Sequence, residues 1–151
     1  MDEEMQREME VRQPFPLLDQ LPGELDGVIL DYLWDHAKLH ALTDLREVTV
    51  PVSDLAWHLD LPFWADDGKP FKVCPSDVVV DRHRHSAQWD RTMAADLQFP
   101  LHGRIGSTEK IIIMDGVHRL LKASIIGLPE VTVRILSDND LNEIAVLSRN
   151  S

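Results

Sequence analysis

The feature that most constrains the fold is a strand pattern that runs directly into a helical one. Lys110 to Met114 is a β-branched, apolar run of the kind found in buried strands. Asp115-Gly116 turns the chain, and apolar residues then return at helical spacing from Val117 to Ile126. Gly127 is typical of the residue that follows a helix C-terminus. We therefore expect a strand, a tight turn and a helix in one unbroken unit.

The rest of the chain also mixes strand and helix patterns. Strands are predicted at 47–52, 101–105 and 131–136, and Pro51 indicates that the first of them lies at a sheet edge. Helical spacing or capping predicts helices or helical turns at 24–42, 53–59, 75–77, 86–97 and 137–147, with Ser86 and Ser137 as the expected caps of the last two. Prolines and an Asp-Gly pair predict a turn-rich connection at 61–73.

Together these elements predict an α+β fold: a small mixed β-sheet flanked by helices, with an N-terminal helical extension. Residues 1–46 form the extension, an acidic arm followed by an amphipathic helix, and residues 47–151 form the domain itself.

The acidic charge is concentrated in the first part of the chain. Fifteen Lys and Arg against 26 Asp and Glu give the 151 residues a net charge of −11. Residues 1–60 hold four basic and 14 acidic residues, whereas residues 61–151 hold 11 and 12. Within 82–122, seven basic residues face four acidic ones. The second part therefore suits a small anionic ligand, whereas a duplex-DNA binder, which needs many basic side chains, is not expected.

The single cysteine, Cys74, excludes a disulfide framework and any multi-cysteine metal site, and it favours a reducing, cytoplasmic location. Neither a secretory signal nor a membrane span of ~20 apolar residues is recognisable. His36 and His40 have the i, i+4 spacing that can chelate zinc, but no third ligand of the usual motif accompanies them. We expect a structural or surface role for this pair, and no structural metal.

The turn after the buried strand is the main candidate site. A helix N-terminus offers unpaired N–H groups to an anion, and Gly116 lets a ligand approach the backbone. Arg119 can hold phosphate oxygens with its guanidinium, and His118 can donate a hydrogen bond or move a proton. A structural interpretation also fits: Asp115 caps the helix, Gly116 serves the turn, and Arg119 pairs with a carboxylate.

A second polar cluster runs from Arg82 to Ser86, at the start of the helix predicted at 86–97. Arg84 and Ser86 could form another wall of an anion site. The alternative interpretation is a solvated loop with a serine cap.

The motif from Asp115 to Arg119, between a buried strand and a helix, resembles the signature of the ParB/sulfiredoxin superfamily. The resemblance extends over roughly 47–136, from an opening strand and turn at 50–55 to a last strand at 131–136. The segments 89–100 and 114–123 are similar to short bacterial ParB-like proteins that carry a ParB N-terminal-like domain.

The branches of this superfamily imply different chemistry at the same loop. In sulfiredoxins it reads Gly-Cys-His-Arg; here Val117 replaces the nucleophilic cysteine, so sulfiredoxin activity is not expected. In ParB it reads Gly-Glu-Arg-Arg and holds CTP, and only Gly116 and Arg119 match. Free-serine kinases carry an Asp-Gly-His-His-Arg-like loop that binds ADP, and this loop is the best match. These kinases also have a catalytic glutamate upstream of the loop, for which Asp54 and Glu47 are only positional candidates here.

The resemblance implies a nucleotide- or phosphate-binding protein, with phosphoryl transfer or NTP hydrolysis as the enzymatic hypothesis and ATP, ADP or CTP with Mg²⁺ as the ligand. His118 and Asp115 are the expected catalytic residues, and the expected phosphate-binding residues are Gly116, Val117, His118, Arg119, Arg84 and Ser86. The alternatives are a non-catalytic regulatory module and a nucleic-acid-associated protein of the ParB-like nuclease type. Whether the chain forms a homodimer stays open.

Overall fold

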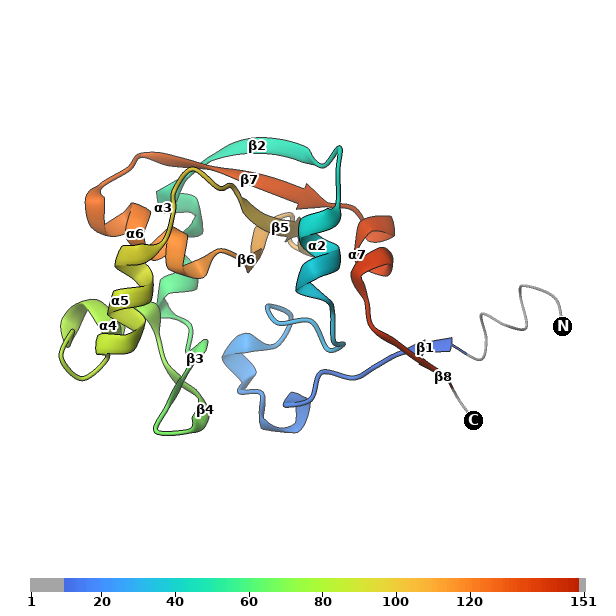
Figure 1. The fold of residues 1–151 in the computed structure, drawn as a ribbon, viewed down its shortest axis with the longest axis horizontal. Coiled ribbons are helices and arrows are strands. Elements are labelled where there is room, and N and C mark those ends of the chain that lie inside the picture. Colours follow the sequence, from blue (N-terminus) through green and yellow to red (C-terminus); the bar gives the residue numbers. More distant parts are fainter. Residues whose placement is uncertain (1–9, 150–151) are drawn as a thin grey trace, which may run out of the picture.

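The computed structural model describes residues 10–149 and shows a mixed α+β fold built on a four-stranded sheet (Figure 1). The strand order is β2-β7-β5-β6, in which β7 pairs antiparallel with β2 and parallel with β5, while β5 pairs antiparallel with β6. The α+β class is confirmed, and β2 lies at a sheet edge, as Pro51 predicts. The strands are β2 (Arg46–Pro51), β5 (Leu101–Ile105), β6 (Ile111–Asp115) and β7 (Glu130–Leu136).

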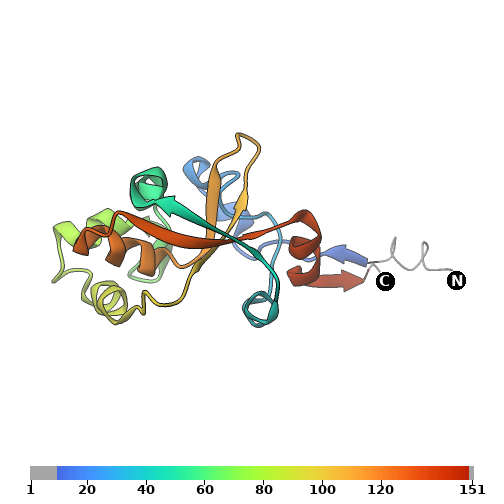
Figure 2. The ribbon, with the colours of Figure 1, turned by 90° about the horizontal axis from the view of Figure 1, so that it is seen from above.

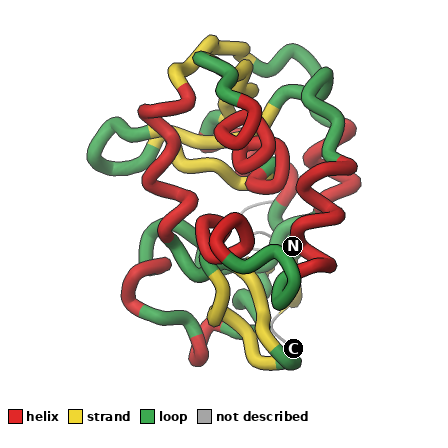
Figure 3. Tube along the Cα trace, turned by 90° about the vertical axis from the view of Figure 1, so that its left-hand side faces the viewer, coloured by secondary structure: helices red, strands yellow, loops and turns green. Residues whose placement is uncertain are grey.

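Helices gather at the two ends of strand β7, which crosses the middle of the molecule (Figure 2). One end carries a group of helices that lie in front of the strands when viewed from that side (Figure 3). This group comprises α3 (Val52–Leu55), the 3₁₀ helix η3 (Ala56–Asp60), α4 (Pro75–Val80), α5 (Ser86–Ala94) and α6 (Val117–Ile126). The other end carries α2 (His36–Ala41) and α7 (Asp138–Ile144). Among residues 10–149, no helix combines the length and apolarity needed to cross a membrane.

The main core lies between the sheet and the helices α3, η3 and α6. Apolar side chains from all of these elements are buried there, among them Val50, Leu55, Leu101, Ile113, Leu120, Leu121 and Val133. A smaller cluster of Leu39, Leu136 and Ile144 joins α2, β7 and α7. The strand–turn–helix unit from β6 to α6 therefore belongs to the main core, which fixes the turn between them.

Two small antiparallel sheets complete the fold. The segment 61–73, expected as a turn-rich connection, contains the hairpin of β3 (Trp64–Asp66) and β4 (Lys69–Val73), with left-handed residues Asp67 and Gly68 in its turn. The expected last helix ends at Ile144, and Leu147 lies instead in β8 (Leu147–Arg149), which pairs with β1 (Glu10–Arg12). The first nine residues of the predicted acidic arm lie outside the described residues.

The long amphipathic helix predicted at 24–42 is wrong. Only α2 is an α-helix within this range; the segment begins in a 3₁₀ turn (Gly23–Leu25) and breaks at Gly27, which has a φ of 77°. The backbone N–H of Leu33 then donates to the carbonyl of Gln13, and the carbonyl of Leu33 accepts from Val146. A helix through Leu33 would need this N–H and this carbonyl for its own hydrogen bonds, but both are paired with distant segments. Tertiary pairing therefore prevents the helix that the apolar spacing predicts.

Candidate functional site

Gly116 begins α6 in a conformation that favours glycine. Its φ is 112°, and a Cβ placed on it would lie 2.9 Å from Leu101 Cγ and 3.0 Å from Arg119 Nη2. Side chains are rarely found at this φ, and at this position there is also no room for one. The sequence therefore needs glycine here for both backbone conformation and packing.

The N-terminus of α6 is open, because no side chain caps it. The first helical hydrogen bond runs from the N–H of Leu120 to the carbonyl of Gly116, which leaves the N–H groups of Val117, His118 and Arg119 unused by the helix. At α7, by contrast, Ser137 caps the helix as predicted, and it does so in a reciprocal capping box with Asp140. The expectation that Asp115 caps α6 is therefore not met; its carboxylate is used elsewhere.

Asp115 is the centre of a charged cluster. Its Oδ2 accepts a hydrogen bond from Arg119 Nη2 at 3.0 Å and lies 3.5 Å from His40 Nε2 and 3.6 Å from His102 Nδ1. The neighbouring His102, Arg119 and His40 together hold the pKa of this carboxyl at about 2 against the effect of its burial. The carboxylate is therefore ionised at neutral pH.

Arg119 is held in place by protein partners. Besides its bond to Asp115, its Nη1 donates to the carbonyl of Pro100 at 2.8 Å, and only 14% of the side chain is exposed. This pairing with a carboxylate is the one that the structural interpretation predicts. The guanidinium has five N–H donors, so this arrangement leaves others available to a ligand.

His118 is supported by two side chains from other elements. Its Nε2 donates to Gln88 Oε1 at 2.7 Å, and its ring stacks on Trp64 with 4.4 Å between the ring centroids. Burial, and to a lesser extent the charge of Arg91, lower the pKa of His118 below its usual value of 6.5. The imidazole is therefore neutral at pH 7, and its second nitrogen is a proton acceptor.

The turn opens into a cleft of about 470 Å³. Three of the polar side chains that line it were identified in the sequence: Asp115, His118 and Arg119. The others come from elsewhere in the fold: His40 from α2, Asp96 from the segment before β5, His102 from β5 and Arg134 from β7. His102 stands opposite Asp115 in the pairing of β5 with β6. No short motif marks His102 or Arg134 in the sequence; only the strand register brings them to the site.

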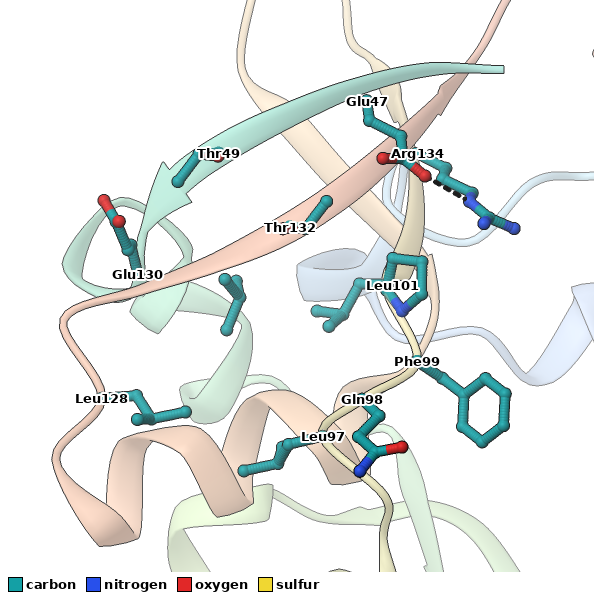
Figure 4. A pocket seen from close by; sticks show the side chains of 12 residues that line it. Glu47, Thr49, Leu97, Gln98, Phe99, Leu101, Leu128, Glu130, Thr132 and Arg134 are labelled. Carbon is teal, nitrogen blue, oxygen red and sulfur yellow. Dashed lines mark hydrogen bonds and ion pairs between the residues drawn. The ribbon is translucent and has the colours of Figure 1, made fainter. Parts of the chain in front are cut away.

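A second cleft of about 520 Å³ adjoins the first and shares Phe99, Pro100 and Arg134 with it. It lies between β2 and β7 on one side and the segment 97–101 on the other (Figure 4). Arg134 donates from Nε to Glu47 Oε1 at 2.9 Å at one end of this cleft, and the Phe99 ring is 63% exposed.

The other predicted site residues do not line the cleft at α6. Arg84 instead donates to Asp66 at 2.9 Å, and Ser86 is the first residue of α5 and not its cap, which is His85 without a side-chain bond. Val117 packs its side chain against the main core, so only its N–H can face a ligand. Of the positional candidates for a catalytic carboxylate, Glu47 lines the adjoining cleft and Asp54 lines neither.

The only cysteine also lies outside this cleft. Cys74 Sγ donates to the carbonyl of Asp60 at 3.3 Å, and burial, reinforced by Asp77 and Asp60, raises the pKa of its thiol. A protonated thiol is a poor nucleophile, so Cys74 does not take over the role of the loop cysteine that sulfiredoxins have where this chain has Val117.

Comparison of the chain with models of known protein families, with curated proteins and with solved structures finds no match.

Proposed function

We propose that the chain binds a phosphate-bearing ligand, a nucleotide, at the N-terminus of α6. The observation that carries this proposal is the uncapped first turn of α6, which follows a left-handed glycine and opens into a cleft lined by Arg119 and Arg134. Unused N–H groups and the positive end of the helix dipole favour an anion at this position. Guanidinium groups add charge-assisted hydrogen bonds to phosphate oxygens.

The adjoining cleft gives the ligand its second half. It shares Phe99 and Arg134 with the phosphate cleft, so a ligand that enters both would place a flat ring system beside an exposed aromatic side chain. Stacking on an aromatic ring is a sequence-tolerant way to hold a nucleobase. A nucleotide therefore fits the paired clefts better than free phosphate does.

The order of strand, glycine turn and helix around Asp115 to Arg119 supports the further proposal that the chain is a divergent member of the ParB/sulfiredoxin superfamily. In the catalytic form of this proposal, the neutral His118 takes the proton from an acceptor hydroxyl or water as its oxygen bonds to the terminal phosphorus. The bond from that phosphorus to the bridging oxygen breaks, and the nucleoside diphosphate leaves. Mg²⁺, if it enters with the nucleotide, would neutralise charge on the phosphate oxygens, while Asp115 holds Arg119 in position.

Thermal unfolding in the presence of ATP, ADP, CTP and GTP, each with and without Mg²⁺, tests ligand binding. A ligand at 100 times its Kd adds about 2.7 kcal/mol to the free energy of unfolding, which for a chain of this size raises Tm by roughly 5–10 °C. We expect at least one nucleotide to do so, and adenosine or cytidine alone to do so far less. If no nucleotide raises Tm, the proposal is wrong.

Two arginine variants locate the site. Arg134→Ala removes a cation that lines the cleft, and Arg84→Ala removes one that does not; each arginine is paired with a single carboxylate. We expect Arg134→Ala to weaken nucleotide binding about tenfold or more, and Arg84→Ala to leave it unchanged. Equal effects of the two variants would contradict a site at α6. Release of phosphate or diphosphate by the wild-type chain then separates an enzyme from a binding module.

A further inference from the structure

Three side chains of the types that bind metal ions converge beside the cleft. They are His36 and His40 on α2 and Asp115 at the end of β6, and one ligand atom from each lies within 4.8 Å of the others. His40 Nε2 and Asp115 Oδ2 are 3.5 Å apart. The i, i+4 spacing places both imidazoles on the same face of α2. The third ligand that the histidine pair lacks in its local sequence is thus supplied from the strand.

The spacing of these atoms suits a metal ion after a small adjustment. Zinc–ligand distances of about 2.0–2.2 Å place neighbouring ligand atoms roughly 3.4 Å apart in a tetrahedral site. The atoms of His40 and Asp115 already have this separation. His36 and His40 are both exposed, so their rings can turn to close the remaining gap of about an ångström without disturbing the core.

A buried imidazole beside Asp115 has a ring nitrogen that is poorly paired. The imidazole of His102 is 4% exposed, and the nearest partner of its Nδ1 is Asp115 Oδ2 at 3.6 Å, which is longer than a normal hydrogen bond; no closer partner lies within residues 10–149. A buried polar atom without a partner is uncommon in folded proteins. Arg119, His40 and His102 all lie closest to the same oxygen of Asp115, Oδ2, which is therefore the oxygen that faces the two imidazoles of α2.

We propose that His36, His40 and Asp115 bind one divalent transition-metal ion. Two imidazoles and one carboxylate favour zinc or iron(II), because magnesium and calcium prefer oxygen ligands alone. His102 supports the site from within the fold, as a partner for Asp115 or for a water on the metal. Three protein ligands leave a coordination position for water or an anion, and two of them, His40 and Asp115, line the cleft at α6.

Cobalt(II) is a suitable probe, because it replaces zinc and its visible absorption reports the ligands. The full chain, freed of metal by a chelator, is titrated with Co²⁺ in a buffer without nucleotide or phosphate. We expect one equivalent to bind, with visible bands of tetrahedral or five-coordinate cobalt and no thiolate charge-transfer band. One equivalent of Zn²⁺ should then displace it.

Variants of exposed histidines assign the site without endangering the fold. We expect His36→Gln and His40→Gln each to weaken Co²⁺ binding at least tenfold, and Asp115→Asn to do the same if circular dichroism shows that it folds. His83→Gln changes an exposed histidine of the 81–85 loop and serves as the control, with unchanged binding.

The proposal is overturned if the wild-type chain binds no stoichiometric Co²⁺ at micromolar concentrations, or if His36→Gln and His40→Gln bind it as tightly as the wild type. It is also overturned if only His83→Gln loses binding. Nucleotide binding does not enter this experiment, so failure here leaves the proposed function to its own test, and the reverse also holds.

Discussion

At the scale of single residues, Gly116 has the most specific local requirement. A side chain at this position would be strained by the left-handed backbone conformation and would also clash with the Leu101 side chain. We expect Gly116→Ala to lower the free energy of unfolding by about 2–4 kcal/mol, because backbone strain of about 1–3 kcal/mol adds to overpacking. Urea denaturation measures this loss.

Gly27 provides the matched control for this substitution. Its φ of 77° is also left-handed, but a Cβ placed on it would meet no atom within 4 Å. Gly27→Ala should therefore cost only the backbone strain, and less than Gly116→Ala. Equal losses for the two variants would show that close packing at the start of α6 contributes nothing.

Residue types and local spacing predicted only part of the site. Asp115, Gly116, His118 and Arg119 are adjacent in sequence and belong to one turn, so their proximity follows from the local pattern. His40, His102 and Arg134 reach the same cleft from three other elements, through the docking of α2 and the register of β5 with its neighbours. A single sequence contains no signal for such long-range pairing.

At the scale of elements, prediction succeeded where local signals and tertiary structure agree. The start and end of α6 follow from Gly116 and Gly127, which are both left-handed in the structure. Strands β2, β6 and β7 each follow a clear run of β-branched or alternating residues, whereas β5, with the sequence Leu-His-Gly-Arg-Ile, has only a weak pattern. The helix expected at 24–42 failed because Leu33 takes its hydrogen-bond partners from residues near the two ends of the chain.

The β3–β4 hairpin shows the opposite error. Pro62 and Pro70 in this segment favour irregular structure, and they outweighed the Asp67-Gly68 pair, which is typical of a two-residue hairpin turn. The strands are short, and Phe71 has a positive φ of 58°, which alternation cannot anticipate. The hairpin nevertheless matters for the site, because Trp64 supports the ring of His118.

At the scale of the whole molecule, a buried histidine links the helices to the sheet. His58 in η3 is fully buried; its Nδ1 donates to the carbonyl of Leu55 at 2.7 Å, and its Nε2 accepts from the N–H of Ile113 at 3.0 Å. Both nitrogens are used in the neutral form, so protonation would break the bond to β6. Burial lowers the pKa of His58 from 6.5 to about 4.

This pKa makes stability depend on pH. Between pH 6.5 and 4 the unfolded chain binds a proton at this histidine and the folded chain does not, so the stabilising contribution is complete above pH 6.5 and is lost as the pH falls. The full loss is about 3 kcal/mol, and His118 adds to it in the same direction. Urea denaturation at pH 7, 6 and 5 should show this decline for the wild type.

His58→Gln tests the assignment. We expect this variant to be less stable at pH 7 but to lose clearly less stability than the wild type between pH 6.5 and 5. A variant with the same dependence on pH as the wild type would assign the proton to another group.

The acidic charge of the first 60 residues does not argue against an anionic ligand, because the proposed phosphate site is built mainly from later segments. Among residues 10–60, His40 alone lines the cleft at α6, and the two arginines of the cleft come from β7 and α6. The net charge of residues 61–151 is close to zero, with local basic excess within 82–122. A small anion meets this local environment, whereas a long polyanion would also meet the acidic segment.

The most direct test of the phosphate site is amide NMR of the ¹⁵N-labelled chain during titration with whichever nucleotide raises Tm most. We predict that the amide resonances of Val117, His118 and Arg119 shift most and saturate together, since their N–H groups donate to the phosphate. Nucleotide binding that leaves these three amide resonances unchanged would contradict the proposed site.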